Sequence, residues 1–163
     1  MTIDLRLNAI VDPERAGGRD LAELARLTAL GGATLIQLRD KISDTRAMVE
    51  TARAIKEALK PFEVPLVVND RVDVALAAGA DGVHVGQDDM AVEDARKILG
   101  RGAIIGLSVK TVDEANAAPV ELIDYVGSGG VAVISALSLA PDPAAAARTL
   151  RGIVDATLAK RGA

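Results

Sequence analysis

Several residue types that carry common chemistries are scarce in this sequence. It contains no cysteine and no tryptophan, and its 163 residues include one tyrosine, one phenylalanine and one histidine. The absence of cysteine excludes disulfides, thiolate metal sites and cysteine nucleophiles. The scarcity of aromatic residues argues against a surface that binds single-stranded nucleic acid by stacking its bases. A Ser-His-Asp triad or a histidine-rich metal site would depend on His84 alone.

Excess positive charge and long apolar runs are missing too. The 23 acidic residues outnumber the 19 basic ones, and the net charge of −4 argues against a surface that coats DNA. No apolar run approaches the roughly 18–20 residues of a membrane span. Residues 1–8 lack the charged-then-apolar pattern of a signal peptide. We therefore expect a cytoplasmic protein with no nucleic-acid partner and no membrane partner.

The sequence does show a regular alternation of two patterns, within one expected domain over residues 1–163. Short runs rich in Val, Ile and Leu, with little polar alternation, are typical of strands covered on both faces. These runs are 7–11, 34–38, 66–68, 82–85, 103–109, 123–126 and 131–136.

Amphipathic helical patterns separate the runs. After Ser43 and Asp44, both suitable N-caps, apolar residues recur at spacings of three and four, namely Met48, Ala52, Ile55 and Leu59. Asp142-Pro143 begins the last helix. Its apolar side is expected to comprise Leu150, Ile153, Val154 and Leu158. Such alternation predicts a parallel sheet with crossover helices, either a (β/α) barrel or an open doubly wound sheet.

One joint breaks the alternation. Only residues 127–130 separate the run 123–126 from the run 131–136. A parallel crossover needs roughly 10–12 residues or more. The two runs therefore pair antiparallel, or merge into one kinked strand, or lack a segment between them.

Polar residues gather just after the expected strands, where both architectures place their chemistry. Alternation puts Gln37 and Arg39 on one side of the second strand, with Lys41 just beyond its end. Arginine as a fork and lysine as a point charge could hold a polyanion. The alternative is a solvated loop with a local ion pair.

Acidic residues follow the next two strands. Asp70 comes directly after Asn69, and Asp89 follows the strand after that. Their carboxylates could converge on one Mg²⁺, which takes few carboxylates together with waters and phosphate oxygens. Asn69 would then be a hydrogen-bond donor to substrate. The alternative is that these residues cap the helices expected to start near positions 71 and 91.

Two further residues complete the set. Ser108 closes the fifth expected strand, where a hydroxyl can bind phosphate or cap the following helix. His84 lies inside an apolar strand, where a lone histidine is usually a packed, hydrogen-bonded core residue. Cations and acids together at the ends of neighbouring parallel strands indicate a diphosphate–Mg²⁺ site.

Four motifs, in order, closely resemble the thiamine phosphate synthase family. They are Gln-Leu-Arg-Asp-Lys at 37–41, Val-Asn-Asp-Arg-Val-Asp-Val-Ala at 68–75, Gly-Val-His-Val-Gly-Gln-Asp-Asp-Met at 82–90 and Ile-Gly-Leu-Ser-Val at 105–109. The resemblance covers nearly the whole chain and implies a TIM-barrel-type fold, shortened here to about seven strands. It implies a Mg²⁺-dependent transferase of thiamine biosynthesis. That enzyme joins 4-amino-2-methyl-5-hydroxymethylpyrimidine diphosphate to 4-methyl-5-(2-phosphoethyl)thiazole and releases diphosphate.

The resemblance also implies roles for individual residues. Contacts to the diphosphate substrate fall on Gln37, Arg39, Lys41, Asn69 and Ser108. Arg39, Lys41 and Ser108 are the residues expected to assist catalysis. Asp70 and Asp89 are the implied Mg²⁺ ligands. Ile134 and Ser135 resemble the last-strand site for the thiazole phosphate, which is expected to use backbone N–H donors.

The chain departs from the family pattern at the irregular joint. After Gly127 the family has a Thr-x-Thr-Lys loop for the two phosphorylated substrates, and then a helix, a strand and another helix. Here the sequence passes directly to Gly130-Val131, so about two βα units, or about 50 residues, are absent. We therefore expect weak turnover or none.

Two other interpretations remain. The chain could be a shortened, non-catalytic barrel scaffold, which closes its exposed strand edges as a strand-swapped homo-oligomer. It could also belong to the related thiazole tautomerase group, which shares the barrel. The intact motifs at 37–41 and 69–70 favour the synthase.

Overall fold

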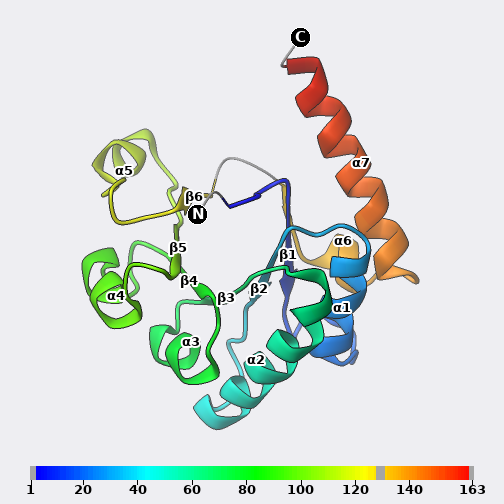
Figure 1. Cartoon of the computed structure of the whole chain (residues 1–163), viewed down its shortest axis with the longest axis horizontal. Helices are drawn as coiled ribbons and strands as arrows, with labels where there is room; N and C mark the ends of the chain where they lie inside the picture. The colour runs from blue at the N-terminus through cyan, green and yellow to red at the C-terminus, as the bar shows by residue number, and fades with distance from the viewer. Residues whose placement is uncertain (1–2, 128–130, 162–163) are drawn as a thin grey trace.

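A computed structural model gives the fold and describes residues 3–127 and 131–161. Seven strands form one sheet (Figure 1): β1 (Leu7–Val11), β2 (Leu35–Leu38), β3 (Leu66–Asn69), β4 (Gly82–Val85), β5 (Ile104–Leu107), β6 (Tyr125–Val126) and β7 (Val131–Val133). The helices are α1 (Leu21–Leu30), α2 (Thr45–Leu59), the 3₁₀ turn η1 (Lys60–Phe62), α3 (Val72–Ala78), α4 (Val92–Leu99), α5 (Val112–Ala117), α6 (Ser135–Ser138) and α7 (Pro143–Arg161).

The helices begin at side-chain caps that the sequence contains. The Asp44 carboxylate accepts a hydrogen bond from the Ala47 N–H at the start of α2, as predicted. Asp142 accepts one from the Ala145 N–H at the start of α7. The predicted apolar face of α2 is buried. These local signals set where the helices begin and which face of α2 packs against the sheet.

The strand order identifies the architecture. Hydrogen bonds join the strands in the order β6-β5-β4-β3-β2-β1-β7, and every pairing is parallel. Six strands thus follow their order in the chain, and β7 adds beside β1, as the closing strand of a (β/α) barrel does. Helices α1 to α5 lie in an arc around the outside of the curled sheet (Figure 1). The sheet is barrel-like, and it keeps the open edges of an open parallel sheet.

The irregular joint has a clear outcome. The runs 123–126 and 131–136 lie at opposite edges of the sheet, so within the described residues they neither pair antiparallel nor merge. Residues 128–130 of the joint lie outside the described part. The prediction that the last run extends to residue 136 is wrong, because the backbone of Ile134 (φ −111°, ψ −81°) leaves the extended region and α6 begins at Ser135.

The two faces of the sheet form two separate apolar clusters. Side chains facing outward, such as Val11, Leu38 and Val68, pack with residues of the surrounding helices. Leu35, Val67, Ile104 and Tyr125 form a smaller cluster on the inner face, against which Ile3 and Leu5 pack. Alternation along each strand separates these two sets.

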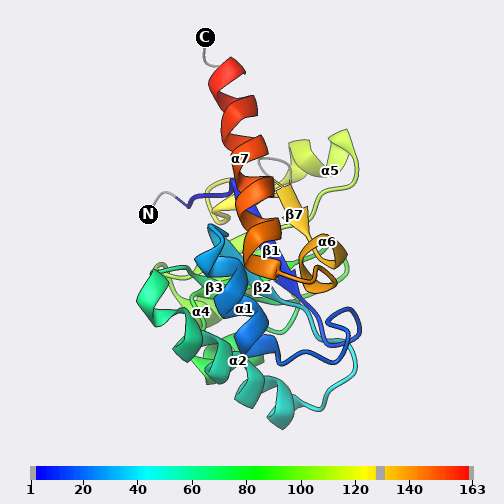
Figure 2. The ribbon, with the colours of Figure 1, turned by 90° about the vertical axis from the view of Figure 1, so that its right-hand side faces the viewer.

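Helix α7 is only partly covered. Its first turns lie close to the end of α1, where Gly31 leaves room for them. A Cβ added to Gly31 would lie only 2.5 Å from the Cβ of Ala147. The rest of the helix extends away from the body of the molecule (Figure 2). Ile153 (58% exposed) and Leu158 (43% exposed), predicted to be on its apolar side, therefore face solvent in large part. Among the described helices, none combines the length and apolar character needed to cross a membrane.

We predict that Gly106→Ala destabilises the fold by about 1–3 kcal/mol, because the added methyl has no room. Its Cβ would lie 2.5 Å from both the Tyr125 hydroxyl and His84 Nδ1. Gly102→Ala is the matched control, since nothing lies within 4 Å of its added Cβ. Urea unfolding monitored by circular dichroism measures both; equal midpoints for the two variants would contradict the packing described.

Candidate functional site

A cavity of about 350 Å³ lies on the inner face of the sheet, toward the carboxyl ends of the strands. Polar residues from five strands or strand ends contribute to its lining: Asn8, Gln37, Arg39, Asn69, His84 and Ser108. Parallel strands bring their carboxyl ends to one edge of a sheet, which is why residues far apart in sequence meet there. The predicted residues Gln37, Arg39, Asn69 and Ser108 therefore share one cavity.

A row of amides crosses the floor of this cavity. Asn8 Nδ2 donates to Gln37 Oε1 at 3.1 Å, and Gln37 Nε2 donates to Asn69 Oδ1 at 2.8 Å. Gln37 is buried at 4% exposure and Asn8 at 8%. Asn8 Oδ1 has no hydrogen-bond partner among the described residues. A buried acceptor of this kind is suited to an N–H group of a ligand.

The arginine of the cavity is held by a buried acid. The carboxylate of Asp12, whose side chain is 0% exposed, forms an ion pair with the Arg39 guanidinium. The register places Val11 beside Leu38, so the next residue on each strand is brought to its partner. Asp12 also accepts a hydrogen bond from the Glu14 N–H at 2.9 Å. The guanidinium is thereby oriented at the mouth of the cavity.

Lys41, Asp70 and Asp89 form a charged cluster just beyond the strand ends. The Lys41 ammonium pairs with the Asp70 carboxylate. Asp70 has a left-handed backbone (φ 62°) and its N–H donates to the His84 carbonyl at 2.8 Å. Burial raises the pKa of Asp70, and the nearby Asp89 carboxylate raises it further against the opposing effect of Lys41. Like-charged carboxylates held together are a typical arrangement for a cation.

Asp89 has a different environment. Burial tends to raise its pKa, but the Gly86 N–H, which donates to Asp89 Oδ2 at 2.8 Å, the hydrogen bond with Asp70 and the charge of Lys41 bring the pKa below its ordinary value. Residues 3–127 and 131–161 contain no group of three or more metal-ligating His, Cys, Asp or Glu side chains. Two carboxylates nevertheless fit Mg²⁺, which keeps several waters and takes phosphate oxygens.

Helix capping does not explain the polar residues at the strand ends. The N-cap positions of α3 and α4 are Arg71 and Ala91, and neither makes a side-chain capping hydrogen bond. Helix α5 is capped by Thr111 and not by Ser108. The capping alternative is therefore wrong for Asn69-Asp70, Asp89 and Ser108.

Ser108 instead belongs to a buried hydrogen-bond chain. Its Oγ lies 2.8 Å from His84 Nε2, and His84 Nδ1 lies 3.0 Å from the Tyr125 hydroxyl. Burial lowers the pKa of His84. His84 is the hydrogen-bonded, buried residue that the sequence predicts, and it also lines the cavity.

Of the predicted residues Ile134 and Ser135, only the first lies at the cavity. Ile134 lines the cavity from the end of β7. Ser135 is exposed at the first position of α6. Three residues of the site were not predicted: Asn8, Asp12 and Tyr125. Asn8 and Asp12 carry the same signal as the others, a polar residue within or directly after an apolar run.

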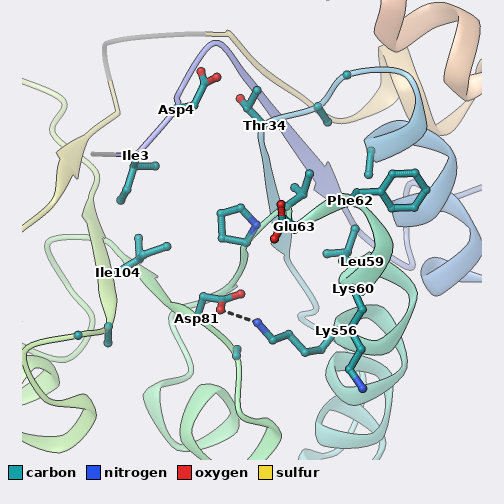
Figure 3. Close-up of a pocket in the computed structure, with 18 of the residues that line it drawn as sticks. Ile3, Asp4, Thr34, Lys56, Leu59, Lys60, Phe62, Glu63, Asp81 and Ile104 are labelled. Atoms are coloured by element: carbon teal, nitrogen blue, oxygen red, sulfur yellow. Dashed lines mark hydrogen bonds and ion pairs between the residues drawn. The ribbon is translucent and has the colours of Figure 1, made fainter. Parts of the chain in front are cut away.

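A larger cavity, of about 920 Å³, lies at the opposite end of the sheet (Figure 3). Several charged residues of its lining are paired: Lys56 Nζ lies 2.5 Å from Asp81 Oδ1, and Arg151 Nε lies 3.0 Å from Asp155 Oδ2. The amino ends of barrel strands usually serve stability. The smaller cavity therefore remains the candidate site.

A family model described as thiamine monophosphate synthase matches residues 7–141. The chain belongs to this family. A thiamine-phosphate synthase of Agrobacterium fabrum is 57% identical over 129 residues, which cover 79% of this chain and 59% of that protein. One of Xanthobacter autotrophicus is 49% identical over 128 residues, which cover 78% of this chain and 61% of that protein. The chain thus spans about three fifths of the length of these relatives.

Two further matches extend over nearly the whole of both chains. A thiamine phosphate pyrophosphorylase from Pyrococcus furiosus superposes with a TM-score of 0.85 at 32% identity, covering 94% of this chain and 97% of that chain. A thiamine-phosphate synthase of Azorhizobium caulinodans is 37% identical over 203 positions, which include 93% of this chain and 96% of that protein. About 50 of those positions have no counterpart among the 163 residues here. This difference in length equals the size of the segment expected to be missing, and its place at the joint stays a prediction.

We predict that Arg39→Met destabilises the protein by about 1–3 kcal/mol, because it leaves the buried Asp12 carboxylate without its cation. Lys97→Met is the control, since it breaks an exposed pair with Asp94 and should cause no measurable change. Urea unfolding at pH 7 gives both values. If Arg39→Met unfolds at the wild-type urea concentration, the ion pair between Arg39 and Asp12 does not contribute to the free energy of unfolding.

Proposed function

We propose that this chain carries the pyrimidine-diphosphate half of a thiamine phosphate synthase site. The observation that carries the proposal is the convergence of Gln37, Arg39, Asn69 and Ser108 on one cavity, with Lys41 and two carboxylates at its rim. An amide-lined floor suits a heteroaromatic ring that bears nitrogen donors and acceptors. Cations at the rim suit a diphosphate.

The residues divide between the two parts of the substrate. Gln37 and Asn69, fixed by the hydrogen bond between them, contact the pyrimidine. Arg39, Lys41 and Ser108 contact the diphosphate and stabilise it as it departs. Their positions are held by Asp12, Asp70 and His84 respectively. Binding therefore requires little rearrangement of Arg39, whose partner is buried.

Asp70 and Asp89 would hold Mg²⁺, and the bound ion would neutralise charge that develops on the leaving diphosphate. The proximity of the two carboxylates, which raises the pKa of Asp70, supports this assignment. Lys41 and Arg39 add fixed positive charge beside the same leaving group.

The proposed reaction requires stabilisation of the charge on the leaving diphosphate and alignment of the two substrates. As the carbon–oxygen bond to diphosphate breaks, positive charge spreads over the aminopyrimidine ring, and the thiazole nitrogen then attacks the methylene carbon. No general base is needed for this step, in keeping with a chain that has one histidine and no cysteine. The residues around the cavity hold the substrate and favour departure of the diphosphate.

The thiazole-phosphate half is incomplete. The residues that hold that phosphate in the family would lie in the missing segment, and only Ile134 and Ser135 remain at the end of β7. Turnover of both substrates by this chain should therefore be weak or absent, although the diphosphate substrate binds. The cytoplasmic location stays a prediction.

Isothermal titration of the pyrimidine diphosphate with and without Mg²⁺ tests the proposal. We expect binding that strengthens at least about tenfold with Mg²⁺, and loss of that gain in Asp70→Asn and Asp89→Asn. Asp94→Asn is the matched control, because it makes the same change in an exposed carboxylate that pairs with Lys97. Unchanged Mg²⁺ dependence in the two site variants would remove the metal assignment, and a rapid turnover with both substrates would refute the half-site.

We also propose that the open sheet favours self-association. In the described residues, β6 and β7 end the sheet with unpaired edges, and α7 exposes Ile153 and Leu158 nearby in the chain. An exchange of strands in which a strand of the partner adds to each open edge would cover those edges. Light scattering should find a dimer whose proportion rises with protein concentration. A monomer at all concentrations would exclude the exchange.

A further inference from the structure

The buried chain Tyr125–His84–Ser108 ends at the cavity and contains groups that the proposed reaction does not itself use. The ring centroids of Tyr125 and His84 are 5.5 Å apart, and each nitrogen of the imidazole faces one hydroxyl. The two hydroxyls differ in setting: Tyr125 is buried at 8% exposure, whereas Ser108 is half-buried at the cavity.

We propose that Tyr125 and His84 are positioning residues that turn the Ser108 hydroxyl into a hydrogen-bond donor toward an anionic ligand. Tyr125 donates its phenolic proton to His84 Nδ1, and His84 Nε2–H donates to Ser108 Oγ. The serine proton is then directed into the cavity. The identity of the ligand as a diphosphate rests on the proposed function. The direction of the hydrogen bonds from Tyr125 through His84 to Ser108 does not rest on it.

The direction follows from the proton of the phenol. Among the described residues, His84 Nδ1 is the one hydrogen-bond partner of the Tyr125 hydroxyl. If Nδ1 carried the imidazole proton, the buried phenolic proton would have no protein acceptor, which is costly. A neutral imidazole that accepts at Nδ1 must carry its proton at Nε2.

The imidazole is neutral in this arrangement, because Nδ1 accepts the phenolic proton and only Nε2 carries a proton. Burial lowers the pKa of His84, and the charge of Asp89 acts in the opposite direction. Burial likewise raises the pKa of Tyr125, so the phenol keeps its proton. The phenol of Tyr125 and the imidazole of His84 therefore each have a defined protonation state.

The backbone is shaped to allow this contact. Tyr125 pairs with Gly106, and Gly106 in turn pairs with His84 on the next strand. The tyrosine ring thus crosses over the middle strand, and a Cβ there would collide with both rings. The glycine permits a hydrogen bond between two strands that are not neighbours.

The state of Ser108 decides what a ligand meets. With Nε2–H as donor, Ser108 Oγ accepts and its proton is available to a phosphate oxygen. In the opposite tautomer the serine proton would be used up by Nε2, and the ligand would face lone pairs only. An anionic oxygen would be repelled by that arrangement.

Because His84 is the only histidine, its tautomer can be read directly. We expect ¹⁵N nuclear magnetic resonance of the histidine-labelled full chain at pH 7.5 to show protonated Nε2 and unprotonated Nδ1. In Tyr125→Phe the tautomer preference should weaken, because Nδ1 loses its donor. A protonated Nδ1 in the wild type would overturn the proposal without bearing on substrate binding.

Binding of Mg²⁺ with inorganic pyrophosphate gives the second measurement. Ser108→Ala should weaken binding about tenfold and Tyr125→Phe about threefold to tenfold. In the Ser108→Ala background, Tyr125→Phe should have no further effect, since it acts through that serine. An equal loss in both backgrounds would show a merely structural tyrosine. Val120→Ala, at an exposed residue outside the cavity, is the control.

The two proposals can fail separately. If the wild-type chain does not bind pyrophosphate at all, the proposed function fails, and the tautomer of His84 still decides whether Tyr125 directs the chain. If pyrophosphate binds but the tautomer is reversed, the half-site stands and Tyr125 and His84 are structural.

Discussion

The alternation of side chains along parallel strands is the constraint on which this molecule depends. One set of residues faces the helices and is wholly apolar, which leaves the other set facing inward. The inner set forms an apolar layer near the amino ends of the strands and an amide-rich layer near their carboxyl ends. On the same strands, the apolar layers therefore stabilise the fold, and the amide-rich layer is available to bind a ligand.

Ion pairs follow from the same geometry. Asp12 and Arg39 come one residue after a paired position on β1 and β2, so the register alone brings them together. Lys41 and Asp70 extend the pattern beyond the ends of β2 and β3. A sheet in which β2 did not lie between β1 and β3 would separate these residues, even though the sequence motifs would be unchanged.

Much of the fold and part of the site could be predicted from the sequence. The first five strands and the cap at Asp44 follow from local patterns that the structure keeps. The end of β7 could not, because it depends on a change of backbone conformation at Ile134. The exposure of Ile153 and Leu158 depends on which elements are present beside α7, and a periodic pattern carries no such information. Asn8 and Asp12 carry the same local signal as Gln37 and Arg39, and only the strand order shows that they pair with them.

The contact between Lys41 and Asp70 has a consequence for electroneutrality. Without a ligand, each of these two groups already has an opposite charge beside it. If a metal-bound diphosphate binds at the proposed site, Lys41 would pair with the phosphate and Asp70 would hold the metal. Binding then becomes an exchange of counterions within the protein. The cluster never has to hold a bare buried charge, before the ligand enters or after the product leaves.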